Sequence, residues 1–318
     1  MTKPLKNKQW SPLQTGDLVD VIAPGYASSP EEVEGALQFL QQWGLRSHWS
    51  KTSLQKHFLH ANSDEKRFHF LKQALLNKNS KVIWCMRGGY GSNRLLPYLE
   101  KTPRPSHVKL LIGISDITSL HVFLNQKWGW PTLHGPLLDR LGRDLIAKKH
   151  QQELKKILWG QDDTITFSGL KPLNAAALKT THLRSEIVGG NWVVLGGHMG
   201  TRFQVDTKNK FIFLEEIGER AYRIDRLIEQ FSQAGLWNQA KAIFLGDFTH
   251  GQEPDGSHKK LPQVIKRWAA DLKTPLFSGL PAGHGAVQRP VPMHTKAVLS
   301  KSSTGSFHLT IDTGVLLS

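Results

Sequence analysis

Residues 108–120 read VKLLIGISDITSL and form the stretch from which both the fold and a candidate site can be inferred. The apolar run 108–112 is typical of a buried strand, and after Gly113 the pattern that starts at Ser115 and Asp116 predicts a helix. A serine at a tight strand-to-helix turn has its hydroxyl directed away from the sheet. The first N–H groups of a helix lack intrahelical acceptors and, with the helix dipole, can stabilise an oxyanion. One turn can therefore supply both a nucleophile and an oxyanion donor for acyl transfer.

The same residues also have a purely structural interpretation. Serine and aspartate are favoured helix N-caps. The esterase turn G-x-S-x-G is absent, because Ile117 occupies the position of its second glycine. The local sequence therefore leaves catalysis and simple capping both open.

Length and composition are those of a globular protein with one large domain or two of ordinary size. The chain has 318 residues, 39% of them hydrophobic, and a net charge of +15. A basic balance favours anionic partners. The lysines and arginines are nevertheless spread along the chain, and no basic run is interleaved with aromatic residues. We therefore expect no nucleic-acid partner.

Cysteine usage and the N-terminal segment bear on the cellular compartment. A single cysteine, Cys85, excludes an internal disulfide and is consistent with a reducing environment. Residues 1–8 are charged and no apolar segment follows them, unlike a signal peptide. No apolar run approaches the length of a membrane span. These features predict a cytoplasmic protein without a membrane partner.

Strand-like and helix-like segments alternate through the first half of the chain. Ser29, followed by Pro30 and two glutamates, is a typical helix N-terminus, and Gly44 ends that helix. The alternation predicts a parallel sheet with helices on both faces, which binds ligands at the carboxyl ends of its strands, where Ser115 falls. The predicted strands are 17–22, 81–86, 108–112 and 131–134, and the predicted helices are 30–43, 64–77, 92–99 and 115–127.

The second half contains shorter strands and more glycine and proline, which predicts a separate β-rich domain. The predicted fold class is α/β, with an N-terminal, mostly parallel sheet flanked by helices and a C-terminal β-rich α+β domain. We expect these domains at 1–145 and 181–318, joined by a connecting helix and linker at 146–180. The predicted strands are 184–188, 210–214, 240–245, 296–300 and 306–311, and one amphipathic helix has Tyr222, Ile224, Leu227, Ile228 and Phe231 on its apolar side.

A glycine-rich turn, RGGYGS at 87–92, lies between a predicted strand and a predicted helix. Glycines permit a tight turn and a close approach of ligand to backbone N–H groups. The turn matches neither the dinucleotide fingerprint nor the Walker loop. It is either a plain turn or, beside Ser115 at a neighbouring strand end, a second source of oxyanion donors.

A serine nucleophile needs a base, and the base needs an orienting carboxylate. Glu215 and Glu216 end the predicted strand, and because tandem strand residues point in opposite directions, at most one can serve. Alternatively, both are solvated strand-end charges. Among 15 histidines, His284 is distinctive because glycines flank it on both sides. The chain order Ser115, Glu215, His284 matches the nucleophile–acid–base order of α/β-hydrolases.

Metal chemistry has little support in the sequence. The chain lacks the H-E-x-x-H motif and contains one cysteine. The polar loop with Asp247, His250, Glu253 and Asp255 has no recognised ligand spacing. We expect neither a metal nor a cofactor.

Six motifs taken together resemble the LD-carboxypeptidases, the serine peptidases of bacterial cell-wall recycling. The motifs occur in family order, and the resemblance as a whole extends from residue 22 to beyond His284, which makes the set far more specific than any one of its members. They lie at residues 87–91, 113–118, 134–136, 189–191, 213–216 with 222–226, and 279–284.

The resemblance implies a role for each candidate residue. The N-terminal domain would carry the nucleophile Ser115, and the C-terminal domain would carry the general base His284 and its orienting residue Glu215, with the site in the groove between the domains. The backbone N–H groups of Gly89 and Asp116 would form the oxyanion hole. Two further residues within the motifs, Arg87 and Asn191, would bind substrate.

The resemblance also implies the reaction. Such enzymes release the terminal D-Ala of the murein tetrapeptide L-Ala-D-Glu-diaminopimelate-D-Ala, free or sugar-linked, through an acyl-enzyme. Family members are typically cytoplasmic homodimers without a metal. The alternatives are a related serine peptidase that cleaves acyl-sulfamoyl adenylates, giving immunity to an antibiotic, or a catalytically idle protein that binds murein fragments or nucleic acid.

Two features depart from the family pattern. Residues 192–199 read WVVLGGHM, where a small apolar run would be expected, and His198 either adds a polar contact or fills a loop. The positive charge is also higher than expected, which fits a substrate with several carboxylates.

Overall fold

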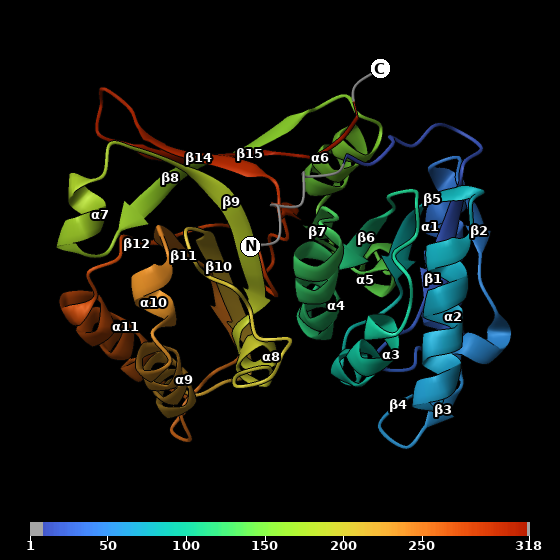
Figure 1. The fold of residues 1–318 in the computed structure, drawn as a ribbon, viewed down its shortest axis with the longest axis horizontal. Helices are drawn as coiled ribbons and strands as arrows, with labels where there is room; N and C mark the ends of the chain where they lie inside the picture. The colour runs from blue at the N-terminus through green and yellow to red at the C-terminus, as the bar shows by residue number, and fades with distance from the viewer. Residues whose placement is uncertain (1–8, 317–318) are drawn as a thin grey trace. The chain divides into compact units, whose positions relative to one another are not determined.

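The computed structural model describes residues 9–316, apart from the side chains of 53 and 54 (Figure 1). The described chain consists of two compact units, each containing residues that are distant in sequence. The first, here called the sheet unit, comprises 9–163, 289–294 and 313–316. The second, the barrel unit, comprises 164–288 and 295–312.

The sheet unit is built on a six-stranded sheet in the order β13-β7-β6-β5-β1-β2. All neighbouring strands are parallel except β13, which runs antiparallel to β7. This confirms the predicted, mostly parallel N-terminal sheet. The strands are β1 (Leu18–Ile22), β2 (Arg46–His48), β5 (Ser80–Cys85), β6 (Leu110–Gly113), β7 (Thr132–His134) and β13 (Val291–Met293).

The first helix of the sheet unit begins at the capping signal that the sequence contains. The Ser29 hydroxyl accepts a hydrogen bond from the Glu32 N–H, and the Ser29 N–H donates to the Glu32 carboxylate, which makes a complete capping box. The predicted helix after Ser115 is present, but it changes from a 3-10 turn to an α-helix and then to a π-turn. The helical elements are α1 (Pro30–Gln42), η1 (Lys51–Leu54), α2 (Asp64–Leu76), η2 (Ser92–Leu95), α3 (Leu96–Glu100), η3 (Ser115–Ile117), α4 (Thr118–Phe123), η4 (Leu124–Trp128), α5 (Leu138–Gly142) and α6 (Lys148–Leu158), with a small hairpin of β3 (Lys56–His57) and β4 (His60–Ala61).

The barrel unit is a closed barrel in the order β10-β11-β12-β8-β15-β14-β9. The neighbours from β9 to β12 are parallel and the remaining pairs are antiparallel. The predicted β-rich C-terminal domain is thus confirmed, and its closure removes exposed sheet edges. The strands are β8 (Thr164–Pro172), β9 (His182–Asn191), β10 (Phe211–Ile217), β11 (Ala242–Thr249), β12 (Leu276–Ser278), β14 (Lys296–Lys301) and β15 (Phe307–Asp312).

Aromatic side chains hold the helices of the barrel unit together. The Trp237 ring lies 5.7 Å from that of Trp192, 5.0 Å from that of Trp268 and 5.0 Å from that of Phe231, measured between centroids. Tyr222, predicted on the apolar side of its helix, is instead exposed among the guanidinium groups of three arginines. The helices are α7 (Ala175–Lys179), α8 (Trp192–Gly196), α9 (Ala221–Gln233), α10 (Leu236–Gln239) and α11 (Lys260–Asp271) (Figure 1). Within residues 9–316, no helix is both long and apolar enough to cross a membrane.

The segment 146–180, expected as a connecting helix and linker, belongs partly to each unit. Helix α6 lies in the sheet unit, whereas β8 and α7 lie in the barrel unit. Strand β8 pairs with β15 and β12, which follow it by more than 100 residues. Its polar residues alternate with buried ones, and this pattern becomes a strand only through that distant pairing.

A buried ion pair joins β1 to the residue that precedes β6 in the sheet unit. The Lys109 ammonium lies 2.6 Å from Asp20 Oδ2, and both side chains are almost completely buried. Burial raises the pKa of Asp20, but the charge and hydrogen bond of Lys109, with bonds from Ser80 and Asn77, hold it below its usual value. The pair is thus compensated by several donors and acceptors.

Removing one partner of this pair should destabilise the sheet unit strongly. We expect Lys109→Met to lower the free energy of unfolding by about 3–5 kcal/mol, because it leaves Asp20 buried without its cation. The matched control, Lys81→Met, breaks the more exposed pair with Asp17 (2.7 Å) and should cost at most about 1 kcal/mol. Urea denaturation compares the two, and equal losses would contradict this account.

Candidate functional site

The turn at Ser115 has a strained backbone. Ser115 has a φ of 65°, in the left-handed region that residues other than glycine rarely adopt. Such strain is found at functional sites, where the surrounding structure maintains it. Gly113 permits the turn, because a Cβ there would lie 2.8 Å from Ile117 Cγ1. The serine is thus the first residue of η3, two residues after β6 ends at Gly113.

The Asp116 carboxylate binds the glycine-rich loop to this turn. It accepts hydrogen bonds from the N–H groups of Gly91 (3.2 Å) and Ser92 (2.8 Å) and is buried. Burial raises the pKa of Asp116, and the hydrogen bonds from Ser92 and Gly91 oppose that rise. The side chain of Asp116 therefore positions the loop, while its backbone N–H is among the first of the helical turn that follows Ser115.

The glycine-rich loop lies directly against the nucleophile candidate. A Cβ on Gly88 would be 3.0 Å from Ser115 Cβ and 3.3 Å from its Oγ. Gly89 has a φ of 101°, and a Cβ there would be 2.4 Å from Tyr26 Cβ. Within one unit, the structure thus brings together the Ser115 turn and the loop of Gly89, the two predicted sources of oxyanion donors.

A buried histidine that no sequence motif contains, His121, binds the backbone just before the Ser115 turn. The Nε2 of His121 donates to the Gly113 carbonyl at 2.8 Å. Burial, with the neighbouring His134, lowers the pKa of His121 to about 3. The imidazole is therefore neutral at any physiological pH and keeps this donor. His121 lies on α4 beside other buried polar side chains, and it belongs to no recognisable sequence motif.

Arg87, expected to bind substrate, connects the glycine-rich loop to α1. Its guanidinium donates to both carboxylate oxygens of Glu32 at 3.1 Å and lies 5.7 Å from the ring centroid of Tyr26. These contacts fix the direction of the side chain. Contact with a substrate stays a prediction.

The predicted acid and base meet in the barrel unit. His284 Nδ1 lies 2.6 Å from Glu215 Oε2, although 69 residues separate them. Glu215 lies within β10, opposite Asn191 of β9, and is fully buried, while the His284 side chain is 12% exposed. A carboxylate at Nδ1 fixes the tautomer with hydrogen on that nitrogen, so that Nε2 is the basic nitrogen.

Glu216 points away from this pair and has a different environment. It accepts bonds from Asn191 Nδ2 (3.0 Å), Val193 N (2.8 Å) and Ile217 N (2.9 Å). Burial raises the pKa of Glu216 to about 7, which these bonds partly oppose. Asn191, expected to bind substrate, is buried in these contacts and also caps α8 by accepting from Val194 N. His198 is buried just beyond α8, and burial lowers its pKa.

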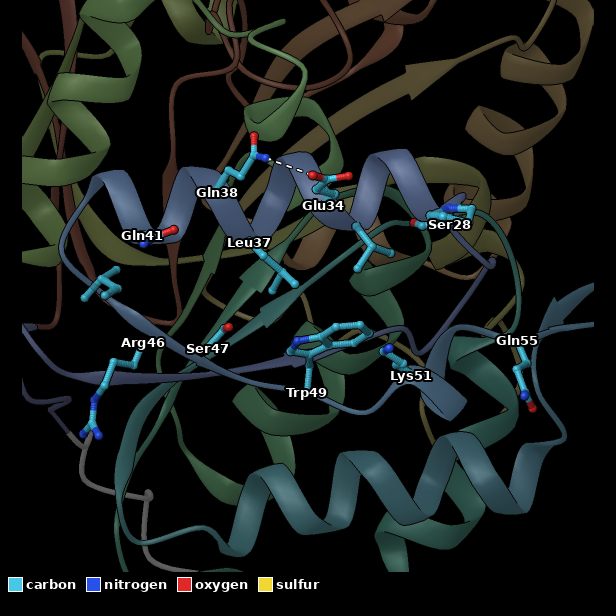
Figure 2. Close-up of a pocket in the computed structure, with 13 residues that line it drawn as sticks. Ser28, Glu34, Leu37, Gln38, Gln41, Arg46, Ser47, Trp49, Lys51 and Gln55 are labelled. Atoms are coloured by element: carbon cyan, nitrogen blue, oxygen red, sulfur yellow. Dashed lines mark hydrogen bonds between the residues drawn. The ribbon is translucent and has the colours of Figure 1, made fainter.

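Within the described chain the candidate site residues form no metal site, and they lie outside the cavity of Figure 2. Across the described chain, no group of three or more His, Cys, Asp or Glu side chains is arranged to hold a metal ion. A cavity of about 1040 Å³ is lined by residues of α1, β2, η1 and the segments beside them. In Figure 2, Leu37 and Trp49 point toward each other across it. None of the predicted site residues lines it.

Loss of the Asp116 carboxylate should loosen the glycine-rich loop. We expect Asp116→Asn to lower stability by about 1–3 kcal/mol, because an amide directs one donor at a backbone N–H and leaves it unsatisfied. Hydrogen exchange at Gly91 and Ser92 should accelerate. The control Asp206→Asn removes an exposed carboxylate that accepts from Lys208 N, and it should change neither quantity. Unchanged exchange in Asp116→Asn would contradict this role.

Comparison with known proteins covers both units. Residues 19–135 match the LD-carboxypeptidase N-terminal domain, and residues 184–299 match the LD-carboxypeptidase C-terminal domain. A putative carboxypeptidase of Rickettsia conorii is 36% identical over 76% of this chain and 75% of its own length. The murein tetrapeptide carboxypeptidase of Pseudomonas aeruginosa is 30% identical over 94% of this chain and 97% of its own.

Solved structures share the fold. The crystal structure of muramoyltetrapeptide carboxypeptidase from Oxalobacter formigenes has a TM-score of 0.80 and 24% identity, over 93% of this chain and 98% of its own. The structure of MccF, a microcin C7 self-immunity protein, in complex with glutamyl sulfamoyl guanosine has a TM-score of 0.81 and 19% identity, over 96% of this chain and 98% of its own.

Proposed function

Because the chain belongs to the LD-carboxypeptidase family, we propose that it is a serine peptidase that releases the terminal D-Ala of murein tetrapeptide. The relative named for that activity is 30% identical over nearly its whole length, which supports this substrate class. The proposal retains free or sugar-linked peptide as substrate, a cytoplasmic homodimer and no cofactor, as the sequence resemblance implies.

The observation that carries the proposal is the hydrogen bond of 2.6 Å between the buried Glu215 carboxylate and His284 Nδ1. A fully buried carboxylate on one imidazole nitrogen is the arrangement that orients a general base. The strained turn at Ser115, which adjoins the glycine-rich loop, supports the same reaction class.

The proposed reaction proceeds through an acyl-enzyme. Ser115 Oγ attacks the carbonyl carbon of the residue before D-Ala, and His284 Nε2 accepts the hydroxyl proton. The N–H groups of Gly89 and Asp116 stabilise the oxyanion. His284 then returns the proton to the amine of D-Ala as the C–N bond breaks. A water molecule, deprotonated by His284, hydrolyses the ester and regenerates Ser115.

The charge of the protein is compatible with this substrate. The stem peptide carries several carboxylates, and a net charge of +15 attracts anionic ligands in solution. Attraction of this kind should weaken as salt is added.

Cleavage of an acyl-sulfamoyl adenylate is the second candidate. The structural likeness to the microcin C7 self-immunity protein favours it. At 19–20% identity, this is a likeness of the fold alone. The two reactions share a serine nucleophile and differ in the leaving group, so a substrate panel distinguishes them.

Substitution of Ser115 tests the nucleophile. We expect Ser115→Ala to reduce D-Ala release from tetrapeptide by about 10⁴-fold or more with the fold intact, because no other group supplies the attacking oxygen. A fluorophosphonate probe should label the unmodified enzyme and not this variant. Ser168→Ala, on an exposed position of β8, is the control and should retain full activity. Retained turnover in Ser115→Ala would overturn the mechanism, and exclusive turnover of the adenylate would select the second candidate.

The tandem glutamates should differ sharply in their effect on catalysis. We expect Glu215→Gln to lower kcat by about 10³–10⁴-fold, because an amide cannot stabilise the imidazolium or hold the correct tautomer. Glu216→Gln removes a carboxyl that contacts Asn191 and Val193 and should mainly lower stability. Steady-state kinetics and thermal unfolding on both variants give the comparison. The reverse order of kcat effects would transfer the orienting role to Glu216.

A further inference from the structure

A second carboxylate, Asp247, lies beside the Glu215–His284 pair. Asp247 is on β11, the parallel neighbour of β10, so the carboxyl ends of both strands meet at one edge of the barrel. The register shifts there: Leu214 is opposite Leu245, whereas Glu216 is opposite Phe248. One residue of β10, Glu215, therefore faces two of β11. Such a bulge redirects side chains and is often found next to active sites.

Asp247 binds the His284 loop at two points. Its backbone N–H donates to the Ala282 carbonyl at 2.9 Å, and its Oδ2 accepts from the Gly285 N–H at 3.2 Å. These bonds lie on either side of Gly283 and His284 in the chain. The segment that carries the imidazole is thus fixed to β11 before and after the histidine.

The glycines flanking His284 allow this close packing. A Cβ on Gly285 would lie 2.4 Å from Asp247 Oδ2. A Cβ on Gly283 would lie 2.9 Å from Glu215 Cβ and 3.3 Å from Asp247 Cβ. The sequence suggested that these glycines leave the imidazole free to face a cleft. The structure shows that they bring the loop against two carboxylates.

We propose that Asp247 is a positioning residue for His284, which fixes the imidazole-bearing loop and adds a second negative charge that strengthens the base. This inference rests on the proposed function of His284. Two carboxylates from neighbouring strands act on the imidazole, Glu215 from β10 and Asp247 from β11, while Glu216 is turned toward Asn191.

The protonation of Asp247 gives the proposal a pH dependence. Burial raises the pKa of Asp247 to about 6, the charge of Glu215 adds to the rise, and His284 and the Gly285 bond oppose it. Above this pH the carboxylate is charged and stabilises the imidazolium formed in the reaction. As the pH falls through about 6, the carboxyl becomes neutral and that support is lost.

The test compares Asp247→Asn with Asp247→Ala. The asparagine variant keeps an acceptor for the Gly285 N–H and removes the charge, whereas the alanine variant removes both. We expect Asp247→Asn to lower kcat for tetrapeptide about tenfold with little change in KM, because a weaker base transfers the proton less readily. The acid limb of its pH profile should move to lower pH. Asp247→Ala should lower kcat further, because the Gly285 N–H then lacks its acceptor and the loop is less firmly held.

The control is Asp255→Asn, which changes an exposed aspartate that also accepts a backbone N–H, from Ser257, and should leave all these quantities unchanged. Wild-type kcat and an unmoved acid limb in Asp247→Asn would overturn the proposal. NMR titration of the His284 imidazole gives a readout independent of turnover. The midpoint of the His284 titration should move to lower pH in Asp247→Asn. An unchanged midpoint refutes the role of Asp247 even if tetrapeptide proves not to be the substrate. Failure of the unmodified protein on tetrapeptide would instead refute the proposed function.

Discussion

The contact between the buried Glu215 carboxylate and His284 is the interaction on which one end of the barrel unit depends. A carboxylate without exposure to water must have donors or cations nearby. The imidazole meets this need at Nδ1, and the glycines around it let its loop approach closely. Because Glu215 faces His284, its neighbour Glu216 must point the other way, where Asn191 and the start of α8 satisfy it.

The sheet unit contains a strained turn at Ser115, whose backbone conformation is held by neighbouring groups. A serine at positive φ is costly, and the surrounding groups hold it. The Asp116 carboxylate fixes the glycine-rich loop on one side, and His121 fixes the Gly113 carbonyl below. Ser115 and Asp116 resemble a helix N-cap in sequence, but the Asp116 side chain does not cap the helix that it begins. It organises the neighbouring loop instead.

Local patterns predicted most of the sheet unit, since capping residues and apolar runs report on structure within a few residues. The candidate residues Ser115, Glu215 and His284 were also recognisable, from motif and chain order. Strands β8 and β13 were not, because each exists only through pairing with a distant segment. His121 belonged to no motif, and Asp247 was considered only as a possible metal ligand, for the same reason: their roles come from partners that are remote or that a bulge brings near.

The sequence by itself determined the alternation of strands and helices, the glycines that permit tight turns, and the family to which the chain belongs. All of these depend on residue types at short or ordered spacings. Tertiary structure alone decided how the barrel closes and that β13 joins the first sheet. It also places Glu215, the glutamate that the family resemblance implied, against His284. It also decided that Asp247 lies beside that pair. The physical reason is that burial and long-range pairing set these contacts, and neither is encoded in neighbouring residues.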